Sequence, residues 1–261
     1  MYDFHMHTTV SYDGHGSPEQ MAAAAKKAGL REICFTDHRD YMPGVEKQTL
    51  CFDLQAYRDA YDRLSYPGLI IRRGAECSLL PDNQRLMRED LQRYPYDFIL
   101  GSVHLVDGED VYYAPYWQGK QTEAVYRRYL EQTLACVEAH EDFDVLAHLT
   151  YICKCRGNPT HAPLYYTDYP KLADAILTAL IRKDKGLEVN TSGVDRCGTF
   201  LPEAGFVRRF RELGGRIVTV GSDAHNYDRV GQYNAQAPDM LREIFGYVCT
   251  FTGREPVFHR L

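Results

Sequence analysis

The sequence has no uninterrupted apolar stretch of about 18 residues or more, although 44% of its 261 residues are hydrophobic. A membrane-spanning helix needs about 20 consecutive apolar residues, so none is expected. The start of the chain also lacks the apolar segment of a secretory signal, because Asp3 already interrupts it. We therefore expect a cytoplasmic protein that makes no membrane contact.

A disulfide or zinc-finger spacing of cysteines is missing as well. The eight cysteines are scattered along the chain, and several, such as Cys34 and Cys249, lie inside apolar runs. Cys153 and Cys155 are too close together to hold a structural zinc ion alone, and no second pair has a suitable spacing. The pattern is typical of buried, reduced thiols rather than of a disulfide framework.

The chain carries no block of lysine and arginine, and its formal net charge is -6. Proteins that bind nucleic acid non-specifically usually present a basic face, so we expect no nucleic-acid partner. An acidic protein can still bind a small phosphate ester where metal ions and a few arginines set the local field. A small phosphorylated substrate therefore stays compatible with the charge.

Strand-like and helix-like segments alternate along the whole chain, with no linker or low-complexity segment between them. Apolar strands that alternate with helices indicate parallel β-structure covered by helices, here one α/β domain over residues 1–261. Strands are predicted at 2–8, 32–38, 69–77, 97–104, 145–148, 186–191 and 216–225. Helices are predicted at 18–29, 53–65, 84–92, 121–140, 170–183, 203–213 and 237–245, before an apolar tail.

Two local features support this division of the chain. Ser17, Pro18 and Gln20 stand in the register of a capping box with proline in the first turn, which marks the start of the first helix. The segment 151–169 is a long loop rich in Tyr, His and Pro. Long loops in compact domains are often functional, so we expect it to be a lid or a binding loop.

Histidine and carboxylate side chains gather at the ends of the predicted strands. Six of the ten histidines lie there, where chance would place roughly one. The residues are His5, His7, His38, Glu76, His104, His148, Asp223 and His225. His5 and His7 lie two apart on one strand, so their side chains share a face. In parallel α/β folds such strand ends meet at one rim, and His, Asp and Glu without Cys are typical ligands of hydrolytic Zn, Mn or Fe centres.

These strand-end motifs resemble those of the PHP (polymerase and histidinol phosphatase) superfamily over essentially the whole chain. They read His5-Met-His7 with Ser11-Tyr-Asp13-Gly14, Thr36-Asp37-His38, Gly74-Ala-Glu76, Gly101-Ser-Val-His104, Ala147-His148 and Gly221-Ser-Asp223-Ala-His225. The resemblance implies a distorted (β/α)7 TIM-like barrel with a trinuclear centre of divalent Zn, Mn or Fe ions. It assigns His5, His7, Glu76 and Asp223 to one ion, Glu76, His104 and His148 to a second, and Asp13, His38 and His225 to a third.

The resemblance also implies a mechanism, in which a hydroxide that bridges two metal ions attacks phosphorus. Asp13, a metal-bound water or another histidine is the candidate proton donor to the leaving group. His15 is a weaker alternative to Asp13 as a ligand. Asp37 is expected to face the other side of its strand, either supporting a ligand from behind or serving a structural purpose.

Within the superfamily the chain is most similar to the monofunctional histidinol-phosphate phosphatases, by its length and by the segment Leu187-Glu-Val-Asn-Thr-Ser-Gly193. This predicts hydrolysis of L-histidinol phosphate to L-histidinol and phosphate, in histidine biosynthesis. Arg156 and Arg196 are the candidate phosphate contacts, because guanidinium groups bind phosphate in a bidentate manner. Residues 194–198, which include Arg196, depart from the family pattern. The amino-alcohol end of the substrate would also need an acidic or aromatic wall in the site.

Three alternatives stay open at this point. A PHP nuclease or nucleotide phosphatase would need a basic channel or base-stacking loops, which the acidic balance disfavours. An amidohydrolase-like metal hydrolase also begins with His-x-His, but the histidine at 38, the carboxylate at 13 and the histidine at 225 argue against it. A non-catalytic metal-binding module is disfavoured because every expected ligand position is filled.

Overall fold

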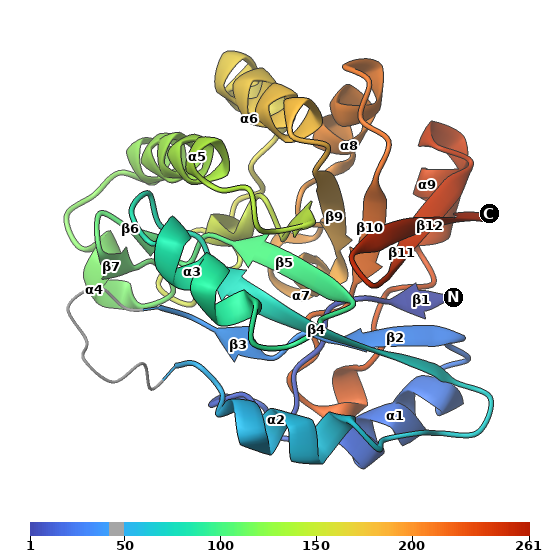
Figure 1. Cartoon of the computed structure of the whole chain (residues 1–261). Coiled ribbons are helices and arrows are strands. Elements are labelled where there is room, and N and C mark those ends of the chain that lie inside the picture. Colours follow the sequence, from blue (N-terminus) through green and yellow to red (C-terminus); the bar gives the residue numbers. More distant parts are fainter. Residues whose placement is uncertain (42–49) are drawn as a thin grey trace.

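The computed structural model describes residues 1–41 and 50–261, which form a parallel β-barrel surrounded by helices (Figure 1). Neighbouring strands pair in the order β1-β2-β4-β5-β8-β9-β10, and every one of these pairs is parallel. Their ranges are β1 Tyr2–Asp3, β2 Glu32–Phe35, β4 Ile70–Ser78, β5 Phe98–Ser102, β8 Val145–Leu146, β9 Gly186–Asn190 and β10 Val218–Gly221. The predicted TIM-like barrel is confirmed.

Backbone hydrogen bonds between the first and last segments of this order close the barrel. The His7 N–H donates to the Ala224 carbonyl, and the Asp223 N–H donates to the His5 carbonyl, each over 2.8 Å. The closure thus lies at residues predicted to bind metal. Backbone pairing alone brings the two ends of the chain, more than two hundred residues apart, to one place.

Several regular strands end before the candidate metal ligands that were predicted to lie on them, although β4 continues past Glu76 to Ser78. The predicted strand 32–38 is split, because β3 (His38–Arg39) pairs with β4 separately from β2. The predictions of 145–148 and 216–225 are too long, because His148 has φ 22° and Asp223 has φ 54°. A positive φ takes a residue out of the extended conformation, and such backbone is concentrated at functional sites.

Helices cover the outside of the barrel (Figure 1). Their ranges are α1 Pro18–Lys27, α2 Leu54–Tyr61, α3 Gln84–Leu91, α4 Ala114–Trp117, α5 Thr122–Ala139, α6 Pro170–Arg182, α7 Val194–Cys197, α8 Ala204–Glu212 and α9 Ala237–Ile244. All predicted helices are present and each is shorter than expected, most of all α2, while α4 and α7 were not predicted. The predicted capping box is confirmed: the Gln20 N–H donates to Ser17 Oγ over 3.3 Å, and the Ser17 N–H donates to Gln20 Oε1 over 2.9 Å. No helix among the described residues has the length and apolar character needed to cross a bilayer.

Two antiparallel hairpins are not predicted by the sequence patterns. The expected apolar tail forms β11 (Tyr247–Thr252) and β12 (Glu255–Arg260). Phe251 of β11 packs against Phe98, with ring centroids 4.8 Å apart, so this hairpin seals the end of the barrel where the strands start. Near the other end, β6 (Leu105–Val106) and β7 (Glu109–Asp110) follow His104 directly.

The cysteines behave as predicted. All eight are free thiols, and each is buried except Cys51, which is half-buried. Cys34 belongs to the smaller of two apolar clusters, together with Phe4, Leu100 and Val145 from neighbouring strands. These thiols therefore fill the core and do not cross-link the chain.

Candidate metal centre

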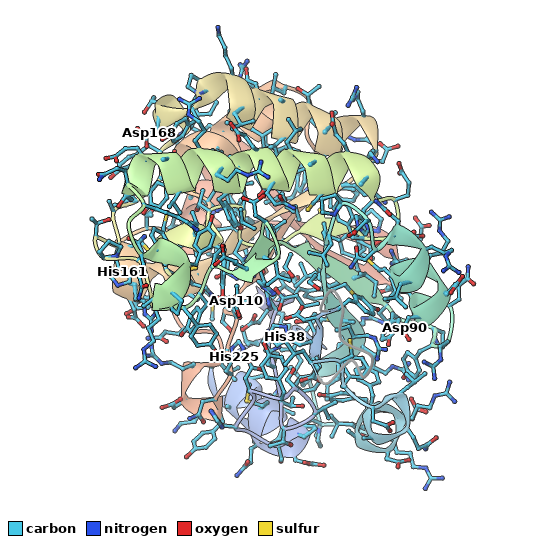
Figure 2. The ribbon with its side chains drawn as sticks, turned by 90° about the vertical axis from the view of Figure 1, so that its left-hand side faces the viewer. His38, Asp90, Asp110, His161, Asp168 and His225 are labelled. Atoms are coloured by element: carbon cyan, nitrogen blue, oxygen red, sulfur yellow. The ribbon has the colours of Figure 1, made fainter. Side chains whose placement is uncertain are left out.

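The strand ends surround one cavity of about 540 Å³. Seven of the nine predicted ligands line it, namely Asp13, His38, Glu76, His104, His148, Asp223 and His225, and the fully buried His5 and His7 lie against Glu76 and Asp223. Figure 2 shows His38, His225 and Asp110 in the middle of the same face of the molecule. The structure thus brings together all the side chains predicted to bind metal.

Glu76 lies at the centre of this cluster, and its two oxygens face different histidines. Oε2 lies 3.3 Å from His5 Nε2 and 3.4 Å from His7 Nε2. Oε1 lies 2.9 Å from His148 Nε2 and 3.4 Å from His104 Nε2. A carboxylate whose two oxygens face separate pairs of imidazole nitrogens is suited to bridge two cations.

His5, His7 and Asp223 form a group at the closure of the barrel. Asp223 Oδ1 lies 3.6 Å from His5 Nε2 and 3.5 Å from His7 Nε2. Among the described residues, these two buried imidazole nitrogens have no hydrogen-bond partner. Buried polar atoms rarely lack a partner, and imidazole nitrogens facing carboxylate oxygens are a donor set that divalent transition metals take. The residues therefore fit a metal ion at this position.

His7 also belongs to a second group, with Asp13, His38 and His225, whose ligand atoms lie within 4.8 Å of one another. Asp13 Oδ2 lies 3.5 Å from His38 Nε2 and 3.2 Å from His225 Nε2. The His7 ring stacks on both histidines, at centroid distances of 4.3 and 4.1 Å. His7 was predicted with the first group alone, whereas the structure places it between the two groups. The His15 side chain is exposed.

The carboxylates of the cluster are held in the ionised form that binds metals. Burial would raise the pKa of Glu76, but His5, His38 and His104 hold it well below its usual value. Burial would likewise raise the pKa of Asp13, which His225 and His38 lower instead. An ionised Asp13 has no proton to give, so these surroundings favour a ligand role for Asp13 over that of proton donor.

The surroundings shift the pKa values of His5 and His7 in opposite directions. Burial would lower the pKa of His5, but Glu188, Glu76 and Asp223 raise it well above its usual value. Burial, with help from His225 and His38, lowers the pKa of His7 to about 3. Metal ligation needs the neutral ring, so cations and protons compete for His5, while His7 is already in the ligating form.

Glu188 holds two candidate ligands in place through hydrogen bonds, although no sequence motif marks it as a site residue. Its Oε1 accepts a hydrogen bond from His5 Nδ1 over 2.7 Å, and its Oε2 accepts one from the His148 N–H over 2.8 Å. A carboxylate on Nδ1 leaves Nε2 as the ligating nitrogen. A charged residue inside the apolar strand at 186–190 was the available signal.

Asp37 supports His7 in a similar way. Its Oδ1 accepts hydrogen bonds from Ser11 Oγ over 3.0 Å and from the Thr8 N–H over 2.7 Å. Ser11 Oγ in turn lies 3.3 Å from His7 Nδ1, and the Tyr61 hydroxyl also donates to Asp37. Of the two roles predicted for Asp37, this geometry favours support of a ligand.

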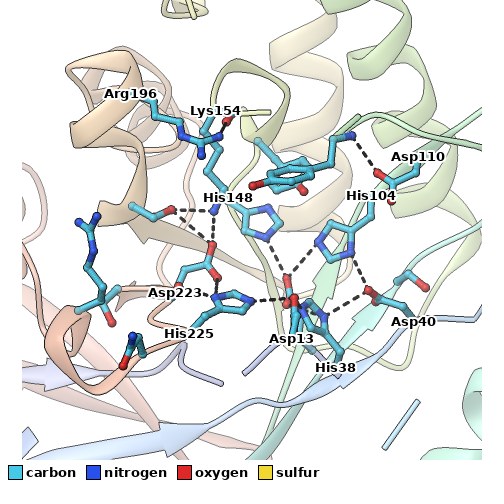
Figure 3. A pocket seen from close by; sticks show the side chains of 18 of the residues that line it. Asp13, His38, Asp40, His104, Asp110, His148, Lys154, Arg196, Asp223 and His225 are labelled. Carbon is cyan, nitrogen blue, oxygen red and sulfur yellow. Dashed lines mark hydrogen bonds and ion pairs between the residues drawn. The ribbon is translucent and has the colours of Figure 1, made fainter. Parts of the chain in front are cut away.

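Lys154 is a cation of the site that the sequence patterns did not reveal. It follows the short 3-10 helix Tyr151–Cys153 in the predicted functional loop, and its side chain is only 14% exposed. Its ammonium pairs with Asp223 and donates to Ser192 Oγ over 2.8 Å (Figure 3). The loop thus reaches the cavity through a lysine.

The two arginines predicted to bind phosphate differ in position. Arg196 lines the cavity, and its guanidinium donates to the Lys154 carbonyl over 2.8 Å (Figure 3). Arg156 is exposed and is not among the residues that line the cavity. Its role in phosphate binding stays a prediction.

Known proteins are similar to this chain in sequence and in architecture. Residues 3–192 match the PHP domain family. A Clostridium acetobutylicum protein named "Probable histidinol-phosphatase" is 30% identical over 88% of this chain and 89% of its own length. The histidinol-phosphatase of Lactococcus lactis is 29% identical over 96% of this chain and 94% of its own length. The crystal structure of the Lactococcus lactis histidinol phosphate phosphatase with zinc, L-histidinol and phosphate superimposes with a TM-score of 0.87, at 26% identity and 98% coverage of both chains. The chain therefore belongs to the PHP domain family.

Proposed function

We propose that this protein is a metal-dependent phosphomonoesterase that hydrolyses L-histidinol phosphate to L-histidinol and phosphate, with residues 1–261 acting as one domain. One observation carries the proposal: five of the predicted ligand histidines surround Glu76, at a cavity that the predicted carboxylate ligands also line. The chain also aligns over 96% of its length with the histidinol-phosphatase of Lactococcus lactis, and the crystal structure of histidinol phosphate phosphatase from that species contains zinc, L-histidinol and phosphate.

Three divalent ions, zinc, manganese or iron, are the proposed cofactors. The proposed ligands are His5, His7, Glu76 and Asp223 for the first ion, Glu76, His104 and His148 for the second, and Asp13, His38 and His225 for the third. Such ions, when bound, lower the pKa of water and neutralise charge on phosphoryl oxygens. The chain's part is to keep the carboxylates ionised and the imidazoles oriented, as Glu188 and Asp37 do for His5 and His7.

Lys154 and Arg196 are the proposed contacts of the phosphoryl group. The Lys154 ammonium lies beside Asp223, so it faces any group that approaches the proposed first ion. Burial would lower the pKa of Lys154, but Asp223 raises it, and the side chain stays charged. A buried positive charge next to the metal ligands suits a phosphate dianion.

Asp110 is the proposed contact of the substrate's amino group. The hairpin after His104 places Asp110 on the cavity wall together with Tyr112, Tyr113 and Tyr151, which supply the expected acidic and aromatic wall. Asp110 accepts a hydrogen bond from the Tyr112 N–H over 2.8 Å, and no lysine or arginine pairs with it in the described ranges. A carboxylate without a cationic partner suits a substrate with an ammonium group at one end and a phosphate at the other.

A substrate panel on metal-loaded protein tests the proposal. We expect phosphate release with the highest kcat/KM for L-histidinol phosphate, compared with a nucleoside monophosphate, phenyl phosphate and a short oligonucleotide. His5→Asn removes a ligand, and the loss of several kcal/mol of metal-supplied stabilisation should lower the rate roughly 100-fold or more. Faster cleavage of the oligonucleotide than of L-histidinol phosphate would contradict the proposal and support a PHP nuclease.

A further inference from the structure

One buried carboxylate of the site, Asp40, belongs to none of the proposed ligand sets. It follows His38 by two residues, so both side chains lie on one face of the segment that contains β3. Asp40 Oδ2 accepts a hydrogen bond from His104 Nδ1 over 3.1 Å and lies at ion-pair distance, 3.2 Å, from His38 Nδ1 (Figure 3). A single oxygen therefore contacts two rings that come from different parts of the barrel.

The opposite nitrogens of these two rings face different ligand sets. His38 Nε2 lies 3.5 Å from Asp13 Oδ2, in the proposed third set. His104 Nε2 lies 3.4 Å from Glu76 Oε1, in the proposed second set. The two rings are also nearly perpendicular, with an interplanar angle of 74° and centroids 5.6 Å apart. They thus diverge from Asp40 toward separate metal positions.

The tautomer that each ring needs for ligation through Nε2 requires a hydrogen-bond acceptor at Nδ1, and Asp40 is in position to be that acceptor. A neutral imidazole carries hydrogen on one nitrogen and a lone pair on the other. A ring that ligates through Nε2 therefore presents an N–H at Nδ1, which needs an acceptor in this buried place. Glu76 Oε2 also lies 3.2 Å from His38 Nδ1, but Glu76 is the proposed bridging ligand, so Asp40 is the acceptor left for both rings.

A competing interpretation is that His38, Asp40 and His104 themselves hold a cation, since their ligand atoms lie within 4.8 Å of one another. That cation would occupy the Nδ1 side of rings whose Nε2 atoms face Asp13 and Glu76. Both ring nitrogens would then have to lose their hydrogens, which neutral imidazole does not do. The geometry therefore favours hydrogen bonding over ligation at Asp40.

We propose that Asp40 is a positioning residue that holds His38 and His104 together in the Nε2-ligating tautomer and thereby couples the second and third metal positions. The inference rests on the proposed metal centre and is independent of the substrate's identity. It predicts that a substitution of this one side chain weakens the binding of two ions at once. The first ion keeps its affinity, because His5 and His7 are supported by Glu188 and Asp37 instead.

Zinc titration of the Asp40→Asn variant tests this coupling. An asparagine accepts from one ring only and presents its NH2 group to the other. In competition with a chromophoric chelator, we expect the wild type to bind three zinc ions. The variant should keep one near its original affinity and bind the other two roughly 10–100-fold more weakly. Asp195→Asn is the matched control, because Asp195 is a carboxylate of the same cavity that pairs with Arg229 and should leave zinc affinity unchanged.

Each other result of the zinc titration would overturn the proposed coupling. A loss confined to one ion, or no loss, would show that the two positions are not coupled through Asp40. The absence of one ion at saturating zinc would make Asp40 a ligand, and an equal loss of all ions would make its role merely structural. Nitrogen-15 NMR of the zinc-loaded wild type needs no variant: a His38 or His104 ring without hydrogen on Nδ1 would equally refute the proposal. Zinc binding as predicted without release of phosphate from L-histidinol phosphate would refute the proposed function alone.

Discussion

Replacing Glu188 by glutamine should weaken both the barrel and the metal centre, although Glu188 is not a proposed ligand. Its two oxygens accept hydrogen bonds from His5 Nδ1, the His148 N–H and Asn190 Nδ2, over 2.7, 2.8 and 3.1 Å. Glutamine keeps one acceptor oxygen and puts an NH2 group in place of the other. In either orientation of the amide, at least one of these buried donors loses its acceptor.

The magnitude follows from the burial of this network. A buried donor without a partner costs about 1–3 kcal/mol. For a chain of this size about 1 kcal/mol corresponds to roughly 2–4 °C, so the metal-free variant should unfold about 2–12 °C lower. Loss of a carboxylate behind a ligating histidine typically weakens metal binding roughly 10–100-fold, or about 1.4–2.8 kcal/mol.

Thermal unfolding of the metal-free protein and a zinc competition titration measure the two effects separately. Glu32→Gln is the matched control, because Glu32 is also a buried glutamate in a barrel strand, but its Oε1 accepts from Arg72 Nε over 2.6 Å. That variant should lose stability and keep its zinc affinity. Unchanged zinc binding by Glu188→Gln, or an equal loss in the control, would refute the reasoning.

Three further predictions concern charge in the cavity. In the metal-free protein, burial would lower the pKa of His104, but Asp40 and Glu76 raise it to about 10. Because this lies above the unfolded value of about 6.5, the resulting stability is complete below about pH 6.5 and is lost as the pH rises toward 10. Urea unfolding across that range should therefore show a steeper decline for the metal-free wild type than for His104→Asn. Asp110→Asn should raise KM for L-histidinol phosphate roughly 10–100-fold in steady-state assays and leave phenyl phosphate hydrolysis unchanged, whereas an equal effect on both would contradict a contact with the amino group. Lys154→Met should weaken inhibition by inorganic phosphate more than Arg156→Met does, and the reverse order would make Arg156 the phosphate contact.

Much of the fold and most of the candidate ligands could be predicted from the sequence because they depend on local patterns. The capping box at Ser17 acts within one helical turn, and apolar runs between helices mark parallel strands wherever they occur. Parallel strands all point the same way, so residues that follow them, such as His148 and Asp223, meet at one rim whatever the order of the strands. The types and approximate positions of the ligands therefore follow from the sequence alone.

The supporting contacts depended on the tertiary structure, because they join side chains far apart in the chain. Glu188 reaches His5 across 183 positions, and Asp40 reaches His104 across 64, with no periodic signal to connect them. The exact strand ends were not predicted either, since no local pattern marks the positive φ angles of His148 and Asp223. The local sequence determines residue type and strand direction. The hydrogen-bond partner of each ligand is determined only when the barrel closes and buries both groups together.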